Sequence, residues 1–101
     1  VKDELREELT HAAQETLSLI AYGGPIMKTT IEYIRGVNSS FTLRNLQIRG
    51  LIEKTTSEHR GSCYQVTTEF IRHLGLAKIT DLPEYETHRQ VITNANNQQP
   101  N

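Results

Sequence analysis

The sequence IRGVNSSFTLRNLQIRG, at residues 34–50, contains the connection that decides the fold. Gly36 stands where the glycine that follows a helix is expected, and the four residues 37–40, mostly polar, leave room for only a tight turn. Ser39 can cap the next helix, which we expect to be closed by Gly50. Two helices joined by so few residues form a helix-turn-helix unit.

Two helical patterns precede the turn of this unit. A first helix is expected to begin after Thr10, a plausible N-cap, and to stop at residues 23–25, which read Gly-Gly-Pro. A second, short helix leads to Gly36, and Met27 at its start offers no side-chain oxygen for capping. The apolar positions that recur at i, i+4 and i+7 are Ala13, Leu17 and Ile20 in the first helix and Met27, Ile31 and Ile34 in the second.

A two-stranded hairpin is predicted after Gly50. Leu51 and Ile52 begin one strand, the polar residues 55–60 with Gly61 turn the chain, and residues 63–66 form the second strand. A hairpin that follows a helix-turn-helix unit is the wing of a winged helix. The fold class that we expect is therefore α+β, mostly α: a winged helix-turn-helix with three to four helices and a two-stranded β-hairpin wing.

The end of the chain is expected to lose regular structure. Thr67 can cap a fourth helix, residues 76–83 read as an extended run, and residues 84–101 are rich in Asn and Gln and are predicted to be disordered. We thus expect a charged leader at 1–8, a winged-helix domain at 9–83 and a disordered tail at 84–101. The predicted core consists of Ala13, Leu17, Ile20, Ile31, Ile34, Leu43, Leu46, Leu51, Phe70 and Leu74.

The charge balance is mild. The 101 residues carry a net charge of −1, whereas residues 9–83 hold 8 basic and 6 acidic side chains and are therefore at +2. Such a balance neither demands nor excludes a nucleic-acid partner. The single cysteine, Cys63, cannot form an internal disulfide, and the apolar stretches are far shorter than a membrane span. We expect a cytoplasmic protein with no membrane contact.

Catalysis and metal binding find no support in the sequence. The histidines and the cysteine belong to separate elements, without CxxC or HxxxH spacing, and no glycine-rich phosphate loop is visible. We therefore expect no enzyme activity, no catalytic residues, no cofactor and no metal site. The residues considered for a metal site are His11, His59, Cys63 and His73.

Five stretches carry a resemblance to a known family. They are AAQETLSLIAY (12–22), IEYIRGVNS (31–39), LRNLQIRGLIE (43–53), TTEFIRHLGL (67–76) and DLP (81–83). In this order and spacing, the chain resembles the C-terminal winged-helix domain of segregation and condensation protein B (ScpB) over residues 9–83. It departs from the family pattern at Met27, where a capping Thr is usual, and in a shorter wing that keeps only Arg60 of a Pro-Gly-Arg-Pro turn.

The resemblance implies a non-enzymatic role. ScpB proteins are accessory subunits of the bacterial SMC–kleisin (condensin) complex, in which they bind the kleisin ScpA during chromosome condensation and segregation. The resemblance also implies a nucleoid-associated protein whose full length pairs through a further N-terminal domain, while the present chain alone is expected to be monomeric. The alternative to a monomer is that the present chain is a purely structural dimerisation domain.

The third helix indicates where a protein partner would bind. A step of 100° per residue places Phe41 and Ile48 nearly opposite the inner face, with Arg44 and Asn45 on the same outer half. Exposed apolar side chains mark protein contacts more often than DNA contacts. Tyr33 on the second helix is a further candidate. The alternative is that Phe41 folds back onto the first helix and that Ile48 is an isolated exposed residue.

A DNA-binding transcriptional regulator is the alternative function. Basic side chains of a helix-turn-helix and its wing can grip phosphates without reading the base sequence. A solvated helix face is the commoner explanation for such charges. The candidates are Lys28, Arg44, Arg49 and Arg60.

Overall fold

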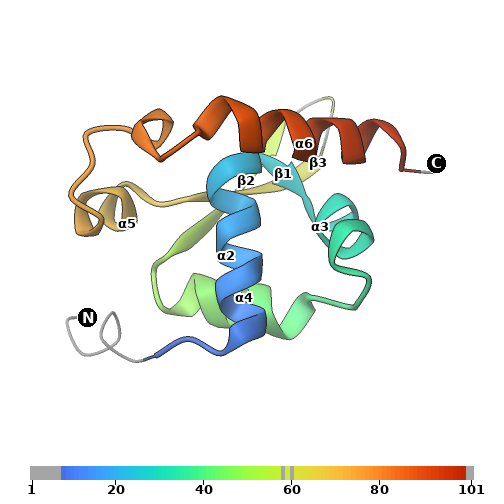
Figure 1. Cartoon of the computed structure of the whole chain (residues 1–101). Coiled ribbons are helices and arrows are strands. Elements are labelled where there is room, and N and C mark those ends of the chain that lie inside the picture. Colours follow the sequence, from blue (N-terminus) through green and yellow to red (C-terminus); the bar gives the residue numbers. More distant parts are fainter. Residues whose placement is uncertain (1–7, 58, 60, 100–101) are drawn as a thin grey trace.

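The computed structural model describes residues 8–57, 59 and 61–99, so the expected leader at 1–8 lies outside the described residues except for Glu8. Figure 1 shows α6 lying across one end of α2 while α4 packs near the other end. In chain order the elements are α2 (His11–Gly23), β1 (Ile26–Met27), α3 (Lys28–Arg35), α4 (Ser40–Ile48), β2 (Ile52–Ser57), β3 (Gly61–Val66), α5 (Thr68–His73), the 3-10 helix η1 (Ile79–Asp81) and α6 (Tyr85–Asn97).

The winged-helix prediction is confirmed in its main elements, but the sheet is larger than expected. Its three antiparallel strands lie in the order β1-β3-β2, with Ile26 opposite Tyr64 at the added edge. β1 has only two residues, too few to give an alternating pattern. β2 extends to Ser57, so residues 55–57, expected in the turn, continue the strand instead.

Helix ends follow the predicted caps with one exception. The hydroxyl groups of Thr10 and Thr67 accept hydrogen bonds from Ala13 N and Phe70 N, and Gly36 takes the left-handed conformation at φ 75°. Ser39 precedes α4, but its side chain makes no capping bond. That prediction is wrong because the backbone of Ser39 has left the extended conformation that a capping side chain needs, with ψ at 11°.

One predicted core residue is exposed. Leu74 follows the last residue of the short helix α5 and keeps 42% of its surface accessible, because the chain turns away at this point. Ile34 and Phe70 are partly buried and pack against the core. The other predicted core residues are buried, namely Ala13, Leu17, Ile20, Ile31, Leu43, Leu46 and Leu51.

The C-terminal region corrects two expectations. Residues 79–81 of the expected extended run form η1, in which Asp81 accepts a hydrogen bond from Lys78 N. The tail expected to be disordered forms the helix α6 at Tyr85–Asn97, which contacts α2, α3 and η1. A polar segment with little apolar periodicity can still be helical when tertiary contacts stabilise it, and single-sequence patterns do not record such contacts.

Candidate partner-binding surface

Helix α4 turns a mixed apolar and polar side to solvent. Its inner residues Leu43 and Leu46 are fully buried, whereas Phe41 and Ile48 are 79% and 71% exposed. These two side chains are seven residues apart, about two helical turns, and therefore share the outer side. At 79% exposure Phe41 does not fold back onto the first helix, so that part of the alternative is wrong, whereas Ile48 as an isolated exposed residue stays an alternative. We define the α4 surface as Phe41, Arg44, Asn45 and Ile48.

A groove lies on one side of Phe41. It has a volume of about 350 Å³ and joins α4 to the start of α3 and to β3. Two cations, Lys28 and Arg44, line it, and the Lys28 Nζ lies 4.0 Å from a carboxylate oxygen of Glu32. We call this cavity the Arg44 groove. Its lining residues are Lys28, Ser40, Phe41, Arg44, Gln47 and Tyr64.

A smaller cavity, of about 50 Å³, lies on the other side of Phe41. It separates α4 from the first turn of α2 and is lined by Leu9, Ala13 and Asn45 among others. Arg49 also lines it and donates a hydrogen bond of 3.0 Å from Nε to Oδ1 of Asn45. Phe41 therefore stands as a ridge between a basic groove and a smaller, partly apolar hollow.

The structure brings together only some of the predicted site residues. Tyr33 lines neither cavity, because its hydroxyl group points to α6, 3.5 Å from the carbonyl oxygen of Gln98. Of the basic residues considered for DNA, Lys28 and Arg44 share one groove, whereas Arg49 lines the other cavity. Arg60 lies outside the described residues.

Three residues near the Arg44 groove escaped the sequence prediction. Tyr64 and Gln47 line it, and Lys54 places its Nζ 5.9 Å from the centre of the Tyr64 ring, within reach of a cation–π interaction. Lys54 and Tyr64 are direct partners in the β2–β3 ladder. This register is the signal that would have found Lys54, and it depends on the length of the hairpin turn.

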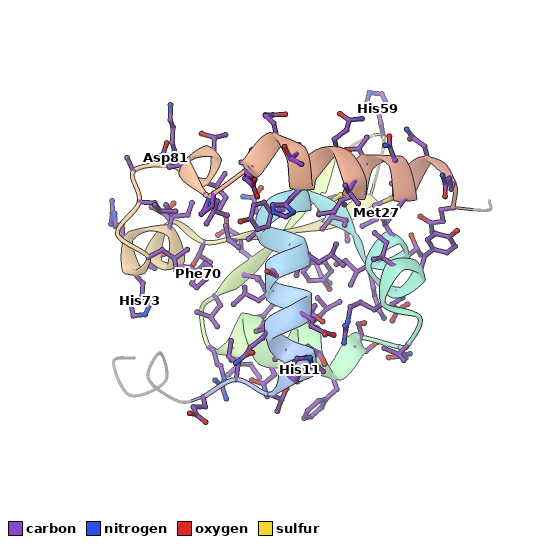
Figure 2. The ribbon with its side chains drawn as sticks, viewed as in Figure 1. His11, Met27, His59, Phe70, His73 and Asp81 are labelled. Carbon is purple, nitrogen blue, oxygen red and sulfur yellow. The ribbon has the colours of Figure 1, made fainter. Side chains whose placement is uncertain are left out.

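Metal-ligating side chains do not gather in the described part of the chain. Figure 2 shows His11, His59 and His73 at three separate edges of the molecule. No group of three or more His, Cys, Asp or Glu side chains among the described residues could hold a metal ion. Within the same residues, no helix has both the length and the apolar character needed to cross a membrane.

Comparisons with known proteins identify the family. The family model described as segregation and condensation complex subunit ScpB matches residues 1–85. The protein of that name from Symbiobacterium thermophilum is 44% identical over 81 residues, covering 77% of this chain and 37% of the relative. The one from Acetivibrio thermocellus is 39% identical over 100 residues, covering 93% of this chain and 50% of the relative.

A solved structure supports the same assignment. The crystal structure of ScpB from Mycobacterium tuberculosis matches with a TM-score of 0.66 and 36% identity, over 74% of this chain and 48% of that one. The chain thus spans half or less of the length of these proteins. With a family model covering residues 1–85 and the winged-helix fold in agreement, the chain belongs to the ScpB family of segregation and condensation proteins.

Proposed function

We propose that this chain is a non-enzymatic accessory subunit of an SMC–kleisin complex that binds a segment of the kleisin ScpA on the α4 surface. The observation that carries the proposal is the exposure of Phe41 beside a groove that holds Lys28 and Arg44. An aromatic side chain that is left in water next to a cavity gains free energy when a partner covers it, about 1.5 to 3 kcal/mol for full burial.

The chemistry of the surface defines the segment it would accept. Phe41 and Ile48 offer two apolar contacts about two turns apart, which suits the apolar side chains of one partner segment. The cations Lys28 and Arg44 favour an acidic residue beside them, because charge complementarity selects the partner and its register. We therefore expect an apolar kleisin segment that carries at least one carboxylate.

The wider role follows from the family and is part of the same proposal. As a member of an SMC–kleisin complex, the protein would act at the nucleoid in the cytoplasm and would reach SMC through ScpA. Relatives that are about twice as long leave room for a further domain through which the full-length protein would pair. The chain of 101 residues would then be monomeric.

DNA binding is the second candidate, favoured by the cations around the Arg44 groove. Lys28 and Arg44 line it, and Lys54 lies over the Tyr64 ring at its edge. A helix that reads DNA, however, presents polar groups to base edges and phosphates along its outer side. Two exposed apolar residues on α4 therefore favour a protein partner over DNA as the main one.

Mapping by NMR tests the proposed function. We expect ScpA from the same organism, added to the isotope-labelled chain, to shift the amide signals of Phe41, Arg44 and Ile48 and to leave those of α5 unchanged. Absence of binding at high micromolar ScpA would contradict the proposal. Binding that shifts only signals outside α4 would contradict the assigned surface.

A further inference from the structure

Helix α6 rests on the domain without being part of its core. It crosses the end of α2 and continues to α3 (Figure 1). None of its residues is buried, and Ile92 alone among its described residues packs against the core cluster. The match to the family model ends at residue 85, where α6 begins. The helix therefore lies on the surface of the core and, apart from Tyr85, beyond the residues that the family model matches.

One attachment of α6 is at the C-terminal end of α2. Arg89 Nη1 donates hydrogen bonds to the carbonyl oxygens of Tyr22 and Gly24, at 3.0 and 2.9 Å. Carbonyl groups at a helix end lack partners within the helix and attract cations. Gly23 lets the two helices approach, since a Cβ atom there would lie 2.9 Å from Cγ2 of Ile92. Arg89 and Ile92 together form the α2 clamp.

The other attachment is on α3. Thr30 is only 2% exposed, and its hydroxyl group lies 2.8 Å from Oδ1 of Asn96 and 2.9 Å from Oε1 of Gln99. A buried hydroxyl group that loses its partners costs free energy, so these side-chain amides matter to α3. Helix α3 has eight residues and no side-chain cap at Met27, and it therefore depends on contacts with its neighbours.

Helix α3 also reaches the α4 surface. Glu32 accepts a hydrogen bond of 2.8 Å from the backbone N–H of Ser39, immediately before α4. Lys28, at the first position of α3, lines the Arg44 groove. The same short helix thus carries Thr30, which contacts α6, and the two side chains that contact the start of α4 and the groove.

The docking of α6 leaves grooves beside the helix that are open to solvent. Cavities of about 360 and 650 Å³ lie along it, the first lined by Thr30, Arg89 and Ile92 and the second by Tyr22, Val91 and Ile92. Glu84, the residue before the helix, has a φ of 52° and makes no side-chain capping bond. A helix with a weak start and polar composition forms mainly through its docking.

We propose that α6 is a reversible strap whose docking on α2 and α3 holds α3 in place and thereby sets the Lys28 side of the Arg44 groove and the start of α4. When α6 undocks, α3 loosens and the α4 surface binds its partner more weakly. The second consequence rests on the proposed function, whereas the first concerns this chain alone.

Amide hydrogen exchange of the whole chain tests the strap without any partner. Ile92→Asp removes the apolar contact with α2, and Val91→Asp is the matched control because Val91 is 64% exposed. We expect Ile92→Asp to accelerate exchange in α6, α3 and at Ser39 by about tenfold or more, with β3 unchanged. Val91→Asp should leave all of these rates near those of the unmodified chain.

Two results would overturn the strap. The first is faster exchange in α6 with unchanged exchange in α3 and at Ser39. The second uses a milder variant, Arg89→Ala, which removes the α2 clamp hydrogen bonds. If exchange in α6 and in β3 accelerates equally in both Ile92→Asp and Arg89→Ala, α6 unfolds only together with the whole domain and is not a strap. If the strap passes this test, ScpA should bind Arg89→Ala several-fold more weakly. ScpA that fails to bind the unmodified chain would contradict the proposed function and leave the exchange result standing.

Discussion

The hydroxyl group of Thr67 donates a hydrogen bond of 2.7 Å to the carbonyl oxygen of Gly50, seventeen residues earlier in the chain. The same hydroxyl group accepts a bond from Phe70 N and so caps α5. The buried side chain of Thr67 therefore ties the turn after α4 to the start of α5. The backbone N–H of Thr67 also donates to Leu51 O, and this bond closes the base of the wing.

Thr67→Ala should lower the free energy of unfolding by about 1 to 3 kcal/mol, because it removes a helix cap and leaves the Gly50 carbonyl without this partner. Thr67→Ser keeps the hydroxyl group and should retain most of the stability. Urea unfolding followed by circular dichroism measures both. Equal loss in the two variants would mean that the methyl group, and not the hydrogen bonds, matters.

The uncapped start of α3 predicts a stabilising substitution. Met27 has the extended backbone of an N-cap residue, with φ at −74° and ψ at 150°, but no side-chain oxygen. Met27→Thr should therefore be more stable than Met27→Ala by about 1 kcal/mol. The comparison of the two variants cancels the lost packing of the Met side chain. Equal melting temperatures for Thr and Ala at this position would refute the capping argument.

Acid should weaken the contact between α2 and α3. Arg35 donates to the carboxylate of Glu15, and this hydrogen bond holds the pKa of Glu15 below its ordinary value. The stability from ionised Glu15 is thus present above the ordinary glutamate pKa, about 4.3, and is lost as pH falls through the lowered pKa. The stability difference between the unmodified chain and Glu15→Gln should shrink over that range. Glu8→Gln serves as the control, and a difference that is constant with pH would contradict the assignment.

DNA binding should be weak and unselective. Lys28 and Arg44 share one groove, and non-specific affinity from a few phosphate contacts falls steeply with salt. In gel shifts we expect binding at low salt to be lost at moderate salt, and Arg44→Ala to weaken it equally for different sequences. Tight, sequence-selective binding that Arg44→Ala abolishes would favour a transcriptional regulator and contradict the kleisin proposal.

Local sequence patterns predicted the elements whose own residues carry helical periodicity and helix-ending glycines. The helices α2 to α4 have apolar stripes at helical spacing and end at glycines such as Gly36, so they could be predicted. The strand β1 could not, because two residues give no period and it exists only by pairing with β3. Helix α6 could not either, because Arg89 stabilises it through backbone atoms 65 and 67 residues away.

The candidate site also has a part that the sequence could predict and a part that it could not. The outward direction of Phe41 and Ile48 follows from the phase of a single helix, and the structure agrees with it. The Arg44 groove depends on how α3, α4 and β3 meet, so the contribution of Tyr64 could not be read from any one element. The contact of Tyr33 could not be predicted, since its hydroxyl group faces helix α6, which local patterns do not indicate.

The affinity of ScpA for the chain and its variants tests the central claim most directly. Isothermal titration should give a Kd that rises about tenfold or more in Phe41→Ala, the change expected from losing one buried aromatic contact of 1.5 to 3 kcal/mol, and that also rises in Arg44→Ala. The matched controls are Arg72→Ala on α5 and Leu74→Ala directly after it, which also truncate exposed side chains and should leave Kd unchanged. An unchanged Kd in both α4 variants, with ScpA still bound, would contradict the claim that the α4 surface holds the kleisin.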